Sequence, residues 1–197
     1  MANFEFASNA AFPRADKRYF PCKASTTFNL GDPVVLTTES SLAVLQPATS
    51  GNIGTLSYGF MGFAAVNGTT DSSGIMGAQI VPSGVSAAAA ITYNIPQYGF
   101  GQAVDAGSGR SLLQIFLANS QNEFWGKLKT ASSTVAAAEL LVGKDAGFDL
   151  TSSVYTVDQS TSNTKCLVII GYDPNDLTRV KFRVKSAYQQ LNIGTTY

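Results

Sequence analysis

The stretch Thr178-Arg179-Val180-Lys181-Phe182-Arg183-Val184-Lys185 places a cation at every second position and an apolar side chain at most of the others. Successive side chains of a β-strand point to opposite faces, so this period of two predicts a strand with one charged face and one buried face. Four like charges at this spacing repel one another, and water or acidic groups must lie opposite them. The surface that meets Arg179, Lys181, Arg183 and Lys185 is therefore the central functional question of this chain.

The composition favours one folded unit with an unusually uncharged surface. A chain of 197 residues with 45% hydrophobic residues is long enough for a real core. Charged residues make up only 13%, which is about half the usual share. Such surfaces suit packed β-structures and large assemblies, because charge is what keeps monomers apart. A net charge of zero also lacks the basic footprint of nucleic-acid-binding proteins, so we expect no nucleic-acid partner.

The charges are unevenly distributed along the chain. No Lys or Arg occurs between Lys23 and Arg110, and nine of the thirteen basic residues lie from Arg110 onward. The charged residues of that middle segment are Asp32, Glu39, Asp71 and Asp105. Two interpretations follow. The basic strand is an exposed sheet edge, where charge discourages unwanted pairing, or basic ends of one subunit meet the acidic middles of its neighbours.

The two cysteines, Cys22 and Cys166, stand 144 positions apart without metal-like spacing. Two free thiols are the expected state, although the sequence leaves a disulfide open. The N-terminal residues lack the basic and apolar regions of a secretion signal, and no apolar run approaches the eighteen or so residues that cross a bilayer. We therefore expect synthesis and folding in a cytoplasm and no membrane partner.

The sequence of residues 1–23 predicts an extended N-terminal arm, because prolines interrupt a segment rich in aromatic residues. Aromatic side chains at this density are poorly suited to solvent, so we expect the arm to dock on a neighbouring subunit or on the body of its own chain. The aromatic residues and prolines are Phe4, Phe6, Phe12, Pro13, Tyr19, Phe20 and Pro21.

Residues 24–197 predict a single all-β barrel or sandwich domain, because short apolar segments alternate with Gly-, Ser-, Asn- and Asp-rich turns at roughly ten-residue spacing. At most one short helix is expected, over residues 134–142, where an alanine-rich core ends at Gly143. Besides the basic strand, the predicted strands are 28–30, 34–38, 42–45, 59–66, 78–81, 90–93, 101–104, 112–117, 154–157 and 165–171.

The residue inventory offers little catalytic chemistry. The chain contains no His, so no Ser-His dyad, Cys-His pair or imidazole metal site is expected. Carboxylate pairs remain as general acid and base candidates, namely Asp145 with Asp149 and Asp173 with Asp176. Both occur in turn sequences, where Asp side chains bond their own backbone, and the second is expected to join two strands as a hairpin. Trp125 is a candidate for stacking on a sugar, although a lone Trp in a strand more often belongs to the core.

Three stretches are similar to phage virion proteins of the capsid cement, or decoration, family. The first is Tyr19-Phe20-Pro21 followed by Thr27–Leu36, which contains the motif Gly31-Asp32-Pro33-Val34-Val35-Leu36. The second is the strand-like segment Gly62–Val66, and the third is the C-terminal hairpin that begins at Cys166. The chain departs from the family pattern over residues 69–90.

The resemblance implies a β-barrel or tulip-like domain on the exterior of an icosahedral phage head, with the major capsid protein as partner and a homotrimer as the assembly. It implies no catalytic, cofactor or metal residues, and it places Gly31, Asp32 and Pro33 in a structural turn. We therefore hypothesise that the arm and the cationic row contact neighbouring subunits or an acidic shell. The candidate contact residues are Phe4, Phe6, Phe12, Arg14, Arg179, Lys181, Arg183 and Lys185.

Two other functions stay open at this point. A virion surface module that recognises a host-cell glycan or receptor would use the Tyr- and Gly-rich stretches at residues 58–63 and 98–101. A carboxylate-based hydrolase would need Asp173 and Asp176, and we expect no such enzymatic activity.

Overall fold

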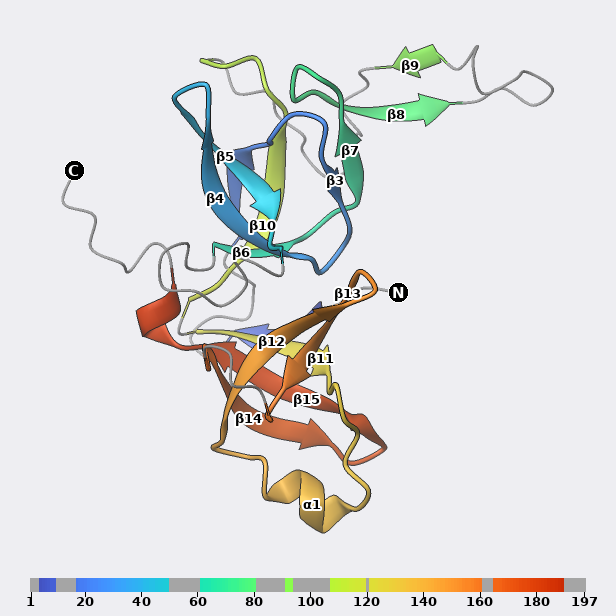
Figure 1. Ribbon diagram of the computed structural model, residues 1–197, viewed down its shortest axis with the longest axis vertical. Coiled ribbons are helices and arrows are strands. Elements are labelled where there is room, and N and C mark those ends of the chain that lie inside the picture. Colours follow the sequence, from blue (N-terminus) through green and yellow to red (C-terminus); the bar gives the residue numbers. More distant parts are fainter. Residues whose placement is uncertain are drawn as a thin grey trace.

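The computed structural model consists mostly of β-strands (Figure 1). It describes residues 4–9, 17–49, 61–80, 91–93, 107–119, 121–160 and 165–189. Within these ranges the helical segments are α1 (Val135–Glu139) and a single 3₁₀ turn at Ser186–Tyr188. The predicted all-β fold with at most one short α-helix is therefore confirmed.

The strands in these described ranges form three hydrogen-bonded sheets. The six-stranded sheet has the order β1 (Phe4–Asn9), β11 (Asn122–Lys127), β15 (Asp176–Val184), β14 (Leu167–Asp173), β12 (Asp145–Thr151) and β13 (Val154–Asp158). The five-stranded sheet has the order β2 (Lys17–Pro21), β10 (Leu112–Leu117), β6 (Gly62–Ala64), β4 (Pro33–Glu39) and β5 (Leu42–Pro47). The four-stranded sheet has the order β3 (Thr27–Phe28), β7 (Gly68–Thr70), β8 (Met76–Ile80) and β9 (Ile91–Tyr93).

Two lobes result, because both larger sheets curl back on themselves. In the upper lobe of Figure 1, a bridge between Cys22 and Leu45 brings the end of β2 to β5, and the Lys23 amide donates to the Leu45 carbonyl over 2.9 Å. In the lower lobe, a bridge between Leu128 and Val157 brings β13 to the end of β11. Curling of this kind pairs strand edges that an open sheet would leave exposed.

Each lobe has its own apolar core, and β4 contributes side chains to both cores. Val34 packs in the upper core, whereas the next residue, Val35, packs in the lower core. Successive side chains of a strand point to opposite faces, so a strand between two cores serves both. Phe63 of β6 also reaches the lower core. The cores are therefore joined through the strands that separate them.

Along the described strands, the chain passes between the lobes after β1 and again after β10. Strands β1 and β11 lie in the lower lobe, whereas β2 and β10 lie in the upper lobe. Strand β1 pairs antiparallel with β11, and β2 pairs antiparallel with β10. Of the two docking places expected for residues 1–23, the described segments of this range occupy the body of their own chain. The described segments of the predicted arm are extended, and they form two sheet strands.

The motif at residues 31–33 forms a tight turn that leads into β4. Gly31 has φ +82°, a conformation that favours glycine. The buried carboxylate of Asp32 accepts hydrogen bonds from the amide of Asn29 over 2.9 Å and from its side chain over 3.1 Å. Pro33 is the first residue of β4, where its fixed φ suits a strand start.

The basic strand is β15, and it lies inside its sheet between β11 and β14. The interpretation of this strand as an exposed edge is therefore wrong, because its backbone is hydrogen-bonded on both sides. The expected hairpin is confirmed, since Asp173 and Asp176 face each other at the β14–β15 turn.

Helix α1 is shorter than the predicted 134–142. Thr134 caps it by accepting a hydrogen bond from the Ala137 amide over 3.2 Å, and turns replace the helix before Gly143, whose φ is +82°.

Candidate interaction surface

The outer face of the six-stranded sheet carries the cationic row of β15. We call this surface the charged face; it consists of Glu5, Glu123, Trp125, Asp145, Arg179, Lys181, Arg183 and Lys185. The intervening side chains of β15, which are Val180, Phe182 and Val184, are buried in the lower core. The period of two in the sequence thus separates one strand into a charged side and an apolar side.

Acidic residues of the same chain lie opposite the cationic row. Arg179 pairs with Glu5 at 2.6 Å, and Lys185 pairs with Asp145 at 2.8 Å. Glu123 is shared, since one carboxylate oxygen lies 3.1 Å from Lys181 and the other contacts Arg183. On this described face, four cations therefore share three carboxylates, and one positive charge remains in excess. Each cationic side chain stays about one third exposed.

Trp125 lies on the charged face, so the interpretation as a core residue is wrong. Its neighbour Phe124 is fully buried instead, because alternate residues of β11 point to opposite faces. The guanidinium of Arg179 and the ammonium of Lys181 each lie 5.5 Å from the Trp125 ring centroid. A cation over an indole face is attracted by the ring quadrupole, so Trp125 helps to hold the cationic row in place.

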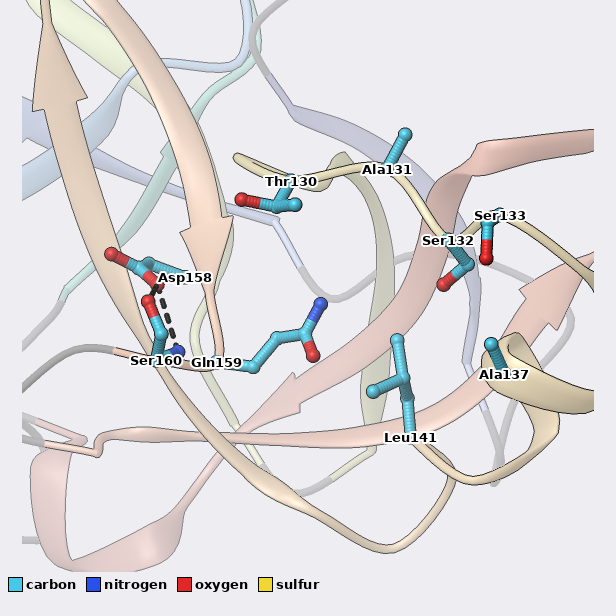
Figure 2. A pocket seen from close by; sticks show the side chains of 9 residues that line it. All are labelled: Thr130, Ala131, Ser132, Ser133, Ala137, Leu141, Asp158, Gln159 and Ser160. Atoms are coloured by element: carbon cyan, nitrogen blue, oxygen red, sulfur yellow. Dashed lines mark hydrogen bonds between the residues drawn. The ribbon is translucent and has the colours of Figure 1, made fainter.

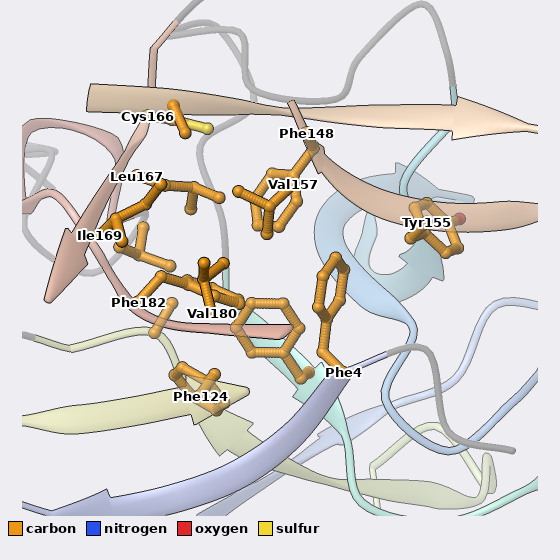
Figure 3. Close-up of a cluster of buried hydrophobic side chains, with 14 of the residues drawn as sticks. Phe4, Phe124, Phe148, Tyr155, Val157, Cys166, Leu167, Ile169, Val180 and Phe182 are labelled. Atoms are coloured by element: carbon orange, nitrogen blue, oxygen red, sulfur yellow. The ribbon is translucent and has the colours of Figure 1, made fainter. Parts of the chain in front are cut away.

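The aromatic contact candidates of the N-terminal segment pack within their own chain. Phe4 is 2% exposed, and its ring lies between 5.1 and 5.4 Å from those of Phe63, Phe148 and Phe182. Figure 3 shows Phe4 in the same cluster as Phe148 and Phe182. Phe6 stacks on Phe116 with ring centroids 5.2 Å apart. Phe12 and Arg14 lie outside the described residues. As placed, Phe4 is enclosed by its own chain, and its ring offers no surface to a neighbour.

The carboxylates proposed as acid and base candidates are engaged by structural partners. Asp145 and Asp149 bind different lysines, Lys185 and Lys129. Asp173 accepts a hydrogen bond from the Asn175 amide over 2.9 Å, in the turn role expected from its sequence.

Asp176 has a comparable structural role on the other side of the same turn. It accepts hydrogen bonds from the Thr178 hydroxyl and amide, which lower the pKa of its carboxyl.

A small polar cavity of about 340 Å³ lies beside α1 (Figure 2). The only acidic side chain in its lining is Asp158, which accepts hydrogen bonds from the Ser160 amide and hydroxyl and from Lys129. Burial raises the pKa of Asp158, but these hydrogen bonds outweigh it and hold the carboxyl ionised. The cavity lining is Thr130, Ala131, Ser132, Ser133, Ala137, Leu141, Asp158, Gln159 and Ser160.

Both cysteines are free and fully buried, so the expectation of two free thiols is confirmed. Cys22 lies in the upper core and Cys166 in the lower core. Burial raises the pKa of each thiol to about 12. Among the residues that the structure describes, no group of three or more His, Cys, Asp or Glu side chains is placed to hold a metal ion.

Comparisons with known proteins identified no relative of this chain. No family model matches it, and the searches of curated proteins and of solved structures found no significant match. In the described ranges no helix is long and apolar enough to span a bilayer.

Proposed function

We propose that this chain is a structural protein of a bacteriophage head, which decorates the capsid exterior and cements neighbouring capsomers as a homotrimer, without catalysis. The observation that supports the proposal is the stretch Gly31–Leu36, which resembles the opening motif of the cement proteins. In the fold, this stretch turns beside Phe4 and then supplies both cores through Val34 and Val35. The motif thus lies where the two lobes and the N-terminal strand meet.

The architecture suits attachment to a preformed shell. Two curled lobes pair most of their strand edges internally, which favours selective docking over open-ended sheet pairing. The charged face alternates cations and carboxylates over three strands, β1, β11 and β15, and over the start of β12. Such a pattern recognises a complementary surface and rejects others.

The internal ion pairs refine the expected electrostatic contact. A carboxylate of the shell would approach cations that already hold Glu5, Glu123 and Asp145, so it would add to these pairs and use the one positive charge in excess. Interactions among partly exposed charges weaken as salt rises, because the Debye length falls to about 8 Å at physiological ionic strength. Binding through the charged face is therefore expected to be moderate in strength and dependent on salt.

The test is to prepare phage particles whose gene for this chain is deleted and to add the purified protein back. We expect the deleted particles to release DNA at a lower temperature and the added protein to restore both heat resistance and surface density in electron micrographs. Wild-type particles that contain none of this chain by mass spectrometry, or deleted particles of unchanged heat resistance, would refute the proposal.

Removal of residues 1–23 is unsuited to this test, because it would also remove Phe4 from the lower core and so destabilise the fold. A better variant is the triple substitution Glu123→Gln, Lys181→Gln and Arg183→Gln, which removes charge without leaving an unpaired ion. We expect it to bind the deleted particles several-fold more weakly, with a smaller salt dependence. The matched control is Lys144→Gln, an exposed cation that precedes β12, which is expected to bind like the wild type.

A further inference from the structure

Strand β1 is held by contacts with residues far away in the sequence. It is the first strand of the chain and the terminal strand of the described six-stranded sheet, where it pairs only with β11. The pairing runs from Phe4 opposite Gly126 to Asn9 opposite Asn122, with one irregularity near Ala7. Removing β1 would therefore break a single ladder and no local turn.

The site that β1 occupies, which we call its seat, consists of the edge of β11 and the pocket around Phe4. Close contacts make this seat specific for β1. A Cβ atom built on Gly31 would lie 2.2 Å from the Phe4 carbonyl oxygen, and one built on Gly126 would lie 2.8 Å from the Phe4 ring. Real side chains do not approach so closely, so both positions must remain glycine while Phe4 is seated.

The aromatic walls of the seat come from both lobes. The rings around Phe4 belong to β6, β12, β13 and β15, and Phe6 stacks on Phe116 of β10. Strand β1 therefore occupies a deep, specific site at the junction of the lobes, and its sequence carries two aromatic anchors spaced to fit it.

Strand β1 is tied to the seat of its own chain, rather than to that of another copy, only by its covalent link to β2. This link is the seven-residue segment 10–16. A second copy of the chain carries the same strand and would make the same ladder and ring contacts. The free-energy difference between the two arrangements is then mainly the entropy of tethering, and a tether of this length corresponds to an effective concentration of the order of 1 mM.

We infer that the seat also accepts β1 of a second copy, so that copies become linked by exchange of their N-terminal strands. Exchange of an identical element is a low-cost route to dimers and larger assemblies, because it reuses contacts that already exist. The partner is another molecule of this chain, and the surface is the edge of β11 together with the Phe4 site. This inference stands apart from the proposed role on a phage head and is tested on purified protein alone.

The test mixes two variants with one added cysteine each, Glu5→Cys and Trp125→Cys, because Glu5 and Trp125 face each other across β1 and β11 on the charged face. The variants are unfolded together, refolded at protein concentrations from about 0.01 to 1 mM, treated with a short bifunctional maleimide and quenched before electrophoresis. We expect a covalent dimer that contains one chain of each variant and increases with concentration. Cys22 and Cys166 are buried, so they do not react in the folded protein.

Two controls make the result decisive. Glu5→Cys mixed with Val154→Cys, an exposed position on β13, measures random collision, and the double variant Glu5→Cys with Trp125→Cys measures pairing within one chain. Adding Phe4→Ala to the Glu5→Cys chain is expected to reduce the mixed dimer at least tenfold. Exchange is refuted when the double variant is linked within its own chain while the mixed pair gives no more dimer than the Val154→Cys control at every concentration.

Discussion

At the residue scale, Phe4 joins the N-terminal segment to the rest of the molecule. Its ring is surrounded by Phe63, Phe148 and Phe182, and its backbone lies directly against Gly31. Aromatic pairs in edge-to-face arrangements contribute about 0.5–1.5 kcal/mol beyond the burial of their area. Phe4 is therefore among the side chains on which the stability of the lower lobe depends most.

Substitution Phe4→Ala is expected to lower the free energy of unfolding by about 3–5 kcal/mol, because it leaves a cavity among rings that cannot collapse fully. Urea denaturation followed by Trp125 fluorescence measures the change. The control Tyr19→Ala, at a position 44% exposed on β2, is expected to cost about 0.5 kcal/mol or less. Equal losses for the two variants would mean that Phe4 is not a core residue.

Glu39 links the strands that close the upper lobe, and it predicts a pH dependence. A hydrogen bond from the Ala24 amide and the neighbouring Arg110 guanidinium lower the pKa of its carboxyl below the ordinary value of 4.5. A group with a lowered pKa in the folded state stabilises it above the unfolded pKa, and this contribution is lost as pH falls through the folded pKa.

Unfolding free energies measured between pH 6 and about pH 3 are therefore expected to fall less steeply for Glu39→Gln than for the wild type. The Arg110 guanidinium also donates to the Cys22 carbonyl over 3.0 Å, so it keeps one partner in this variant. Identical pH profiles of the two proteins would exclude a contribution from Glu39.

At the element scale, β15 carries four cations side by side because neighbouring strands supply the acids. Glu123 of β11 lies between Lys181 and Arg183, and its side chain is only 12% exposed. Removing this carboxylate would leave two close cations without their shared partner. The charged face therefore depends on Glu123 more than on its other acids.

Substitution Glu123→Gln is expected to lower the free energy of unfolding by about 1–2 kcal/mol in low salt, and by less in 1 M salt, where screening reduces the repulsion. The matched control is Glu5→Gln, whose side chain is 49% exposed and which is expected to cost about 0.5 kcal/mol or less. Urea titrations of both variants at two salt concentrations give the comparison, and a salt-independent loss at Glu123 would contradict the electrostatic explanation.

Local patterns predicted several elements well. Strand β10 matches the predicted 112–117, β15 and its hairpin follow from the alternating cations, and the strands at 33–39 and 42–47 lie within two residues of their predicted ends. The predicted strand 101–104 lies outside the described residues. These elements are visible in sequence because their side-chain alternation or turn residues are local.

Elements defined by distant partners were missed. The sequence Asp145-Ala-Gly was interpreted as a turn, yet Asp145 begins β12 and pairs with Val168 of β14. The sequence predicts one arm where the structure has β1 and β2, because the prolines indicate an interrupted segment. Each of these strands pairs with a strand more than 90 residues away, which no local pattern reveals. For the same reason the sequence predicted the cations of the charged face but not their acidic partners, which come from β1, β11 and β12.

At the scale of the whole molecule, the two cores are distinct but share β4 and β6. Phe63, Val35 and Ala48 belong to the lower core although they lie on or beside strands of the upper lobe. Loss of either core would therefore expose apolar surface of the other. We expect the lobes to unfold as one cooperative unit, which is common for single domains of this size.

The buried cysteines report this cooperativity, since one lies in each core and burial raises the pKa of both thiols to about 12. Maleimide pulses in increasing urea, applied to Cys22→Ala and Cys166→Ala separately, are expected to give the same labelling midpoint and no labelling of the native protein at pH 8. Two separated midpoints would show that the lobes unfold independently.

The division of the lower lobe between the two ends of the chain matters during synthesis. The ribosome makes Phe4 and its strand well before β15, whose residue Phe182 closes the Phe4 site and which is completed at Val184. At a translation rate of about 5–20 residues per second, roughly 10–35 s pass between the synthesis of Phe4 and the completion of β15. During that interval the side chains of β1 lack their binding site, so a strand that is translated early becomes protected from solvent late.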